Sequence, residues 1–233
     1  MVRLRAVFID VGGPLYDDNN FLVAVSRAVQ EMSAALCLRS PDLADIREAF
    51  DEARNTEGMS IRKTMARRFL GSEDLAVDLH LVTKRHWVHP EGSLYPDAID
   101  FLGRIKGVVA VAVVANQEKA TQEALIRDGL GDLIDVWGIS AMVGFEKPSA
   151  ELFQWALDQL GVTAPEVLHI GNRFDTDVEP ARNMGMKTAW LLRGEAPDEP
   201  PVDQLALADY VLESLAGFSN IVTALATAGP SDV

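Results

Sequence analysis

Short apolar runs alternate with helical segments over most of this chain, and this alternation restricts its fold more than any other feature. The first run, residues 4–11, is almost continuously apolar, as expected of a strand covered on both faces of a parallel sheet. Runs of the same kind alternate with helical periodicity after residue 97. This order predicts an α/β fold with right-handed crossovers and a doubly wound parallel sheet. The later strands are expected at 108–115, 136–140, 167–171, 188–192 and 210–212, with helices at 97–106, 117–128, 149–160 and 177–184.

Residues 17–94 interrupt this alternation with a block that carries no strand-like run. Apolar residues recur there at helical spacing, for example at Phe21, Val25, Val29 and Leu36. We expect further helices at about 42–57, 59–70 and 73–87. The sequence therefore predicts an α/β core formed by residues 1–16 and 95–233, with a helical domain of residues 17–94 inserted into it.

The charge of the chain restricts its partners. The formal net charge is −14, whereas a nucleic-acid-binding protein needs a basic surface to neutralise phosphates. An anionic membrane surface is disfavoured for the same reason. The single cysteine, Cys37, excludes an intramolecular disulfide. We expect a cytoplasmic protein that binds a small molecule, and the oligomeric state stays open.

Polar residues follow several of the expected strands at the point where each strand ends. Ligands of open parallel sheets bind outside the carboxyl ends of the strands, so these residues are candidates for a common site. One ammonium group precedes the helix that begins near residue 149, and a small acidic cluster follows the strand 167–171. The residues expected at this edge are Asp10, Asn116, Lys147, Asn172, Asp175 and Asp177.

The order of these residues resembles that of the haloacid dehalogenase superfamily of hydrolases. Residues 10–15 are similar to its first motif, in which an Asp follows a hydrophobic strand, and residues 115–117 stand where its second motif ends a strand. Lys147-Pro148 resembles the third motif, and residues 169–186 resemble the fourth. The helical block resembles the inserted cap of the subfamily that includes small-molecule phosphatases and haloacid dehalogenases.

The resemblance implies a phosphatase that acts on a small, anionic phosphorylated metabolite through a covalent intermediate. Asp10 becomes the nucleophile, because a carboxylate can form an ester or acyl phosphate that water then opens. Lys147 offsets the negative charges around Asp10, and the amide of Asn116 stabilises a substrate oxyanion. The residues expected to hold the substrate are Gly12, Gly13, Asn116 and Gln117.

A magnesium ion is also implied by the resemblance, because phosphatases of this family bind Mg²⁺ beside the nucleophile. The oxygen ligands that Mg²⁺ prefers are present in the first and fourth motifs. The expected metal ligands are Asp10, the backbone carbonyl of Gly12, Asn172, Asp175 and Asp177.

Three positions depart from the family pattern. Gly12 stands where the phosphatases carry an Asp that protonates the leaving group, and glycine has no proton to give. Ala115 replaces the Ser or Thr of the second motif. Asn172 replaces the first acidic residue of the fourth motif and offers Mg²⁺ a neutral ligand.

These departures leave two alternatives to a phosphatase. A 2-haloacid dehalogenase needs neither metal nor leaving-group acid, although the expected polar sequence at 171–173 is here Gly-Asn-Arg. A catalytically silent protein could instead bind a ligand or partner in the retained cleft. Simpler structural roles also exist for single residues: Asp177 could cap the following helix, and His169 could be a core histidine bonded to the backbone.

Overall fold

The computed structural model describes residues 2–17, 19–56 and 59–228. Within them the chain divides into two compact units. We call the first the α/β unit; it spans Met1–Asp17, Glu91–Ala196 and Pro201–Val233. We call the second the helical unit; it spans Asp18–Pro90 and Pro197–Pro200.

A six-stranded, fully parallel sheet forms the centre of the α/β unit, in the order β3-β2-β1-β4-β5-β6. The predicted doubly wound sheet is therefore confirmed, and its first strand lies in the middle. In register, Ala6 of β1 faces Ala110 of β2 on one side and Val167 of β4 on the other. The strands are β1 (Ala6–Ile9), β2 (Ala110–Ala115), β3 (Val136–Ile139), β4 (Val167–Gly171), β5 (Lys187–Leu191) and β6 (Tyr210–Leu212).

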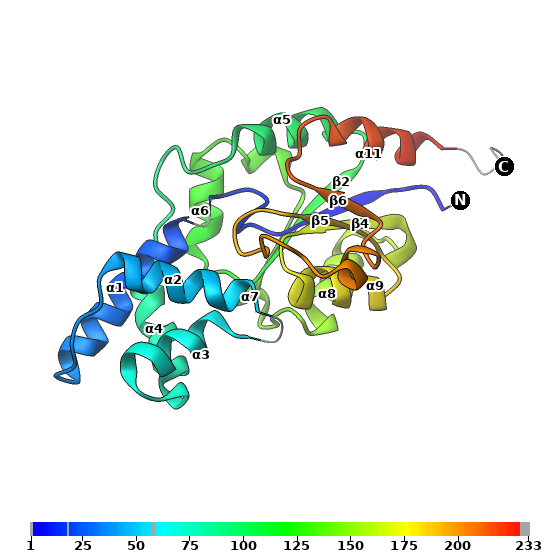
Figure 1. Cartoon of the computed structure of the whole chain (residues 1–233). Helices are drawn as coiled ribbons and strands as arrows, with labels where there is room; N and C mark the ends of the chain where they lie inside the picture. Colours follow the sequence, from blue (N-terminus) through cyan, green and yellow to red (C-terminus); the bar gives the residue numbers. More distant parts are fainter. Residues whose placement is uncertain (1, 18, 57–58, 229–233) are drawn as a thin grey trace. The chain divides into compact units, whose positions relative to one another are not determined.

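Helices cover both faces of this sheet because alternate strand residues point to opposite sides. Val7 and Ile9 pack into a core shared with α5, α6 and α11, whereas Ala6 and Phe8 pack into a second core with α8 and α9. Figure 1 shows α5 and α11 on one face of the sheet and α8 and α9 on the other. The helices of this unit are α5 (Pro96–Ile105), α6 (Ala120–Arg127), α7 (Ser140–Val143), α8 (Ala150–Leu160), α9 (Glu179–Asn183), α10 (Val202–Leu205) and α11 (Phe218–Thr227).

Local sequence signals set the ends of α8, the helix that follows the predicted lysine. The side chain of Ser149 accepts a hydrogen bond from the backbone N–H of Glu151 at the first turn. Gly161 ends the helix with φ +60°, a left-handed conformation that favours glycine. Leu152 and Phe153 on its buried face then anchor the helix against the sheet.

The helical unit has its own apolar core, and the predicted apolar face of its first helix lies in that core. Phe21, Val25 and Val29 are buried, whereas Leu36 is 47% exposed because the helix ends at Ala35. The helices are α1 (Asn19–Ala35), α2 (Leu43–Arg54), α3 (Ile61–Met65) with a π-helical turn (Ala66–Leu70), and α4 (Ala76–His86).

The segment Pro197–Pro200 belongs to the helical unit, although the sequence analysis placed it in the α/β core. Arg54 forms an ion pair with Asp198 at 2.7 Å, and the side chain of Asn55 accepts a hydrogen bond from the Asp198 backbone at 2.7 Å. This contact joins positions far apart in sequence, so periodicity could not have predicted it. None of the helices that the structure describes has the length and apolar character of a membrane span.

Candidate active site

Polar residues from distant parts of the sequence lie at the carboxyl edge of the central strands. Asp10 follows β1 directly, Asn116 follows β2, and Asn172 follows β4. Because β1 lies between β2 and β4 in a parallel sheet, the three residues share one edge. Lys147 reaches the same edge from the loop that precedes α8, as its contact with Asp10 shows.

The Lys147 ammonium lies between two carboxylates at this edge. Its Nζ atom is 2.8 Å from Oδ1 of Asp10 and 2.5 Å from Oδ1 of Asp177. The side chain of Lys147 is 2% exposed and that of Asp177 is 0% exposed, whereas 14% of Asp10 remains exposed. Buried charges require paired and hydrogen-bonded partners, and this arrangement supplies them. Asp10 is the carboxylate of the two that keeps access to solvent.

The two carboxyl groups that share the Lys147 ammonium have pKa values shifted in opposite directions. Burial raises the pKa of Asp10 to about 6, with Lys147 opposing the rise and Asp177 adding to it. Burial acts in the same direction on Asp177, but the charge of Lys147 and the hydrogen bonds from His169 and Lys147 together outweigh it and lower the pKa of Asp177 below the ordinary aspartate range. Burial disfavours the charge of Lys147, yet Asp10 and Asp177 raise the pKa of Lys147 above its usual value. The candidate nucleophile therefore pairs with a lysine that stays protonated, and behind that lysine lies an aspartate that stays ionised.

His169 in β4 contacts the inner carboxylate of this group. Its Nε2 atom is 3.1 Å from Oδ1 of Asp177, and its ring packs edge-on against Phe153 at 5.1 Å between ring centres. Burial lowers the pKa of His169, so the neutral ring donates its Nε2 proton to a carboxylate that can only accept. The expected backbone bond is thus wrong for this atom, because the imidazole bonds to a side chain instead.

Asn116 fixes the backbone that carries the ammonium. Its Nδ2 donates to the carbonyl oxygen of Lys147 at 2.8 Å, and its Oδ1 accepts from the amide nitrogen of Lys147 at 2.7 Å. The family resemblance predicts that this amide stabilises a substrate oxyanion. In the structure both of its polar atoms bond to one residue, which makes Asn116 a support for Lys147.

Gln117, expected to hold the substrate, is engaged within its own loop. Its side-chain Oε1 accepts from the hydroxyl of Thr121 at 3.3 Å, and its backbone N–H donates to the hydroxyl of Ser140 at 3.1 Å. These bonds fix the loop after β2 against α6 and α7. They assign Gln117 a role in shaping the edge of the sheet.

The turn after Asp10 is closed by its own backbone. Gly13 donates to the carbonyl of Tyr16, while Leu15 and Tyr16 both donate to the carbonyl of Val11, each at 2.9 Å. Gly13 adopts φ +82°, and a Cβ atom there would lie 2.2 Å from Nδ2 of Asn172. The positive φ and the close approach both require glycine at this position.

Two predicted metal ligands have other partners. Both oxygens of Asp177 are taken, Oδ1 by Lys147 and His169 and Oδ2 by the backbone N–H of Arg173 at 3.1 Å. Asp175 is exposed and pairs with Arg173 at 2.7 Å. The helix that the sequence placed at 177–184 begins earlier, with a π-helical turn at Phe174–Val178, so Asp177 lies inside a helix and does not cap one.

The remaining predicted metal ligands are Asp10, Gly12 and Asn172. Asn172 donates its Nδ2 to the carbonyl oxygen of Arg193 at 3.0 Å, a bond that fixes which end of the amide is the acceptor. The backbone carbonyl oxygen of Asn172 accepts from the indole of Trp190 at 3.0 Å, so this bond does not involve the side chain. Within residues 2–17, 19–56 and 59–228, no three His, Cys, Asp or Glu side chains group as they would around a metal ion.

Sequence reasoning missed Arg193, which follows β5 and contacts the turn after Asp10. Its guanidinium donates to the backbone carbonyls of Gly13 and Pro14 and pairs with Asp97. No motif marks this arginine, because its partners lie about 100 and 180 positions earlier in the chain. A resemblance to family motifs therefore could not have found it.

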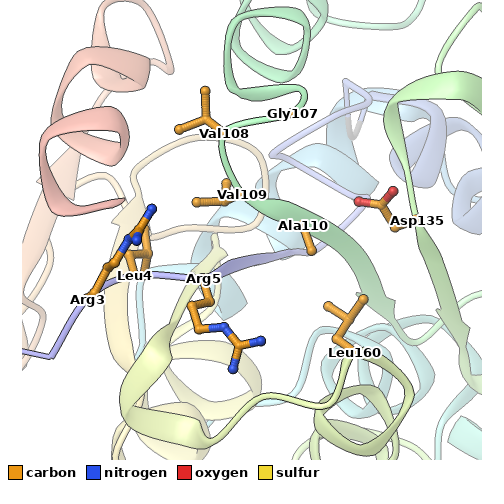
Figure 2. Close-up of a pocket in the computed structure, with 9 residues that line it drawn as sticks. All are labelled: Arg3, Leu4, Arg5, Gly107, Val108, Val109, Ala110, Asp135 and Leu160. Atoms are coloured by element: carbon orange, nitrogen blue, oxygen red, sulfur yellow. The ribbon is translucent and has the colours of Figure 1, made fainter. Parts of the chain in front are cut away.

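A hollow of about 630 Å³ lies at the opposite edge of the sheet (Figure 2). Its walls come from residues that precede β1, β2 and β3 and from the last turn of α8, so it is on the side away from Asp10. Arg5 in its wall already pairs with Glu166 at 3.3 Å. The lining residues are Arg3, Leu4, Arg5, Gly107, Val108, Val109, Ala110, Asp135 and Leu160.

Comparison with known proteins gives consistent results for sequence and fold. The family model of haloacid dehalogenase-like hydrolases matches residues 4–185. A glyceraldehyde 3-phosphate phosphatase from Methanocaldococcus jannaschii is 25% identical over 224 residues, which cover 94% of this chain and 97% of that protein.

Solved structures show the same fold at lower sequence identity. A predicted phosphoglycolate phosphatase from Haemophilus somnus superposes with a TM-score of 0.72 at 16% identity, over 95% of this chain and 99% of that one. The HAD hydrolase YfnB from Bacillus subtilis, solved bound to magnesium, gives a TM-score of 0.69 at 20% identity, over 94% of this chain and 99% of that one. These similarities extend over both units of the chain.

Proposed function

Because the chain belongs to the haloacid dehalogenase-like hydrolase family, we propose that it is a phosphatase that acts on a small phosphorylated metabolite through Asp10. The observation that supports this most directly is the pairing of Asp10 with the buried Lys147 at 2.8 Å. The relative from Methanocaldococcus jannaschii, named a glyceraldehyde 3-phosphate phosphatase, supports a phosphate ester as the substrate class.

The reaction proceeds in two displacement steps that share one nucleophilic site. A carboxylate oxygen of Asp10 attacks phosphorus, the bond from phosphorus to the leaving oxygen breaks, and an aspartyl phosphate forms. A water oxygen then attacks the same phosphorus, the bond to Asp10 breaks, and inorganic phosphate leaves. Asp10 is regenerated as a carboxylate, so the protein undergoes no net change.

Lys147 supports both steps through its charge. The ammonium keeps Asp10 ionised against the burial that raises the pKa of that carboxyl to about 6. It also places a fixed positive charge next to the position of the phosphoryl group, where negative charge is spread over several oxygens. Asn116 holds the Lys147 backbone in place through two hydrogen bonds, which keeps this charge from moving away during the reaction.

The glycine at position 12 restricts which phosphate compounds can react quickly, because it affects how the leaving group departs. The leaving oxygen departs as an anion unless a nearby group gives it a proton, and glycine at this position gives none. Asp177 cannot supply that proton, because it is fully buried and its pKa is lowered by Lys147. Substrates whose leaving group is a stable anion, such as acyl, enol or aryl phosphates, therefore react fastest.

A magnesium ion fits this edge only with help from the substrate. Asp10 pairs with the ammonium and keeps 14% of its side chain exposed, whereas Asp175 pairs with Arg173 and Asp177 is fully buried among its own partners. Mg²⁺ commonly binds to one or two carboxylates together with substrate phosphates. Asp10, the carbonyl of Gly12 and Asn172 would hold it, and it would supply charge neutralisation at the phosphoryl oxygens.

Residues 17–94 are proposed to act as a cap that selects the substrate. Within this range, the part that belongs to the helical unit folds around a core of its own, separate from the sheet that carries Asp10. An independently packed unit inserted directly after the nucleophile turn can move without disturbing the Asp10–Lys147 pair. Closure of such a unit would exclude water and shape the binding site.

Steady-state hydrolysis of aryl phosphate with Mg²⁺ tests the function, with Asp10→Asn as the decisive variant. We expect turnover by the wild-type protein and at least a thousandfold loss in the variant, because an amide cannot form the covalent intermediate. Asp175→Asn is the matched control, since Asp175 is an exposed aspartate paired with Arg173. No turnover on any phosphate, with chloride released from 2-chloropropionate, would instead indicate a dehalogenase. Binding of phosphate without hydrolysis would indicate a silent protein.

A further inference from the structure

Arg193 joins two separate segments of the α/β unit through its guanidinium group. Nε donates to the carbonyl of Gly13 and Nη2 donates to the carbonyl of Pro14, both at 2.7 Å. Nη1 lies 2.9 and 3.1 Å from the two carboxylate oxygens of Asp97, the second residue of α5. The side chain is 13% exposed, and all three nitrogen atoms have partners. Only arginine has a planar group whose N–H donors can point at all three of these acceptors at once.

The same residue contacts the chain where it leaves the α/β unit and where it returns. Its guanidinium carbon lies 3.8 Å from the ring centre of Tyr95, a cation–π contact, and the backbone N–H of Tyr95 donates to Leu15 at 2.8 Å. The backbone carbonyl of Arg193 accepts from Asn172 at 3.0 Å. Arg193 therefore braces the turn after Asp10 against α5, against the returning segment and against the end of β4.

These bonds determine how the backbone of the turn is oriented. A peptide unit is planar, so the direction of a carbonyl fixes the direction of the whole unit. Carbonyls of residues 13 and 14 that point towards Arg193 restrict the preceding peptide of Gly12, which lies two positions after Asp10. The turn has no side chain of its own at Gly12 or Gly13 that could do this.

We propose that Arg193 is a positioning residue for the reaction at Asp10. Its guanidinium holds the turn of residues 11–16 in the conformation in which the backbone of Gly12 faces the phosphoryl group. The effect on the reaction rests on the proposed phosphatase function, whereas the effect on the turn does not. A displacement of about 1 Å near reacting atoms can lower a rate about 100-fold, which sets the size of the expected effect.

Arg193→Lys tests the proposal, with Arg182→Lys as the matched control. Arg182 also donates to a backbone carbonyl, that of Leu207 at 3.1 Å, but it lies in α9. We expect kcat to fall about 100-fold in R193K while KM changes less than about threefold, and R182K to behave like the wild type. Equal kcat in both variants, or a loss that merely follows the fraction of unfolded protein, would overturn the proposal.

Chemical rescue separates a positioning role from a general loss of stability. In Arg193→Ala, added ethylguanidinium should restore kcat at least about tenfold, because the ion can fill the vacated position and bond the same carbonyls. Ethylammonium at equal ionic strength should not restore it, since it lacks the planar fork. Equal rescue by both ions would contradict the assigned geometry.

Backbone amide exchange tests the turn without any hydrolysis. The amides of Gly13, Leu15 and Tyr16 are bonded inside the turn in the wild-type structure. In R193K they should exchange at least about tenfold faster than in R182K, because the brace that keeps the turn closed is weakened. Unchanged exchange would refute the role of Arg193 whether or not the protein is a phosphatase. Faster exchange in a protein that hydrolyses no phosphate would reject the proposed function alone.

Discussion

The side chain of Asn172 fills the space that any side chain at Gly13 would need. A Cβ atom built on Gly13 would lie 2.2 Å from Nδ2 and 2.6 Å from Cγ of Asn172. Asn172 cannot move aside easily, because its side-chain Nδ2 donates to the Arg193 carbonyl and its backbone carbonyl accepts from the Trp190 indole. The ends of β1 and β4 are thus packed together at the candidate nucleophile.

Gly13→Ala should destabilise the protein more than an equally strained glycine substitution elsewhere. Gly144 has a similar φ, +88°, but a Cβ atom there would meet nothing within 4 Å. We expect G144A to lower the free energy of unfolding by about 1 kcal/mol from the backbone alone. G13A should cost about 3 kcal/mol or more, because steric overlap adds to the same backbone term. Equal urea midpoints for the two variants would contradict the close packing.

Removing the ammonium should be costly because it leaves two buried carboxylates facing each other. Lys147→Met is expected to lower the free energy of unfolding by about 3–5 kcal/mol. Adding Asp177→Asn to K147M should recover part of that loss, since one uncompensated charge disappears. Urea unfolding of the two variants measures this, and a double variant no more stable than K147M would argue against charge as the cause.

Asn116→Ala should affect Lys147 indirectly. Two hydrogen bonds to the Lys147 backbone are lost, for which we expect about 2 kcal/mol of stability and a roughly tenfold lower kcat. Asn116→Asp keeps an acceptor but no donor, so it should recover only part of the loss. Gln117→Ala, which removes one longer bond to Thr121, is the control and should have a smaller effect on both quantities.

The pKa of Asp10 predicts how stability changes with pH. Burial raises that pKa to about 6 from 3.8, so the folded state favours the protonated carboxyl. The contribution of Asp10 to stability is therefore largest below pH 4 and is lost as the pH rises from about 4 to 6. Asp10→Asn has no such loss, so its advantage over the wild type should grow to at most about 3 kcal/mol at pH 7. Thermal unfolding between pH 4 and 8 without metal measures the difference, and a constant difference would contradict the raised pKa.

Gly12→Asp should change which substrates are hydrolysed. A carboxylic acid at this position could protonate the leaving oxygen, an effect worth about 10²-fold or more for alkyl phosphates. The gain should be smaller for aryl phosphates, whose leaving groups need little protonation. Gly12→Asn has a similar shape and no proton to give, so it should show no gain. If the wild type already hydrolyses alkyl and aryl phosphates equally well, the assignment of substrate class is wrong.

Much of the α/β unit was predictable, because each of its buried strands corresponds to a short apolar run in the sequence. The run at 167–171 coincides with β4, since a strand buried on both faces is nearly continuously apolar, here with His169 as the exception. β1 is shorter than predicted, Ala6–Ile9, because the chain turns away from the sheet at Asp10. The short helix α10 was missed, as four residues are too few to show helical periodicity.

The candidate site was predictable where a residue type coincides with a strand end or with a family motif. Asp10 meets the first condition and Lys147 the second, and they lie 2.8 Å apart. Asp177 could not be assigned correctly, because whether it faces a metal or an ammonium depends on where the helix after β4 begins. His169 and Arg193 act through contacts that form only in the folded protein, with Asp177 and with the turn after Asp10, which no local pattern records.

The position of β1 also determines when the nucleophile strand can be completed during synthesis. It pairs with residues 110–113 on one side and 167–170 on the other. At about 5–20 residues per second, the ribosome needs roughly 8–32 s after Asp10 to reach the end of β4. Throughout that interval the apolar strand β1 has an open edge on at least one side, a template for pairing with other chains. β1 lies in the middle of the sheet, so Asp10 has partners on both sides in the folded protein. For the same reason, β1 must be kept from pairing with other chains while the protein is being made.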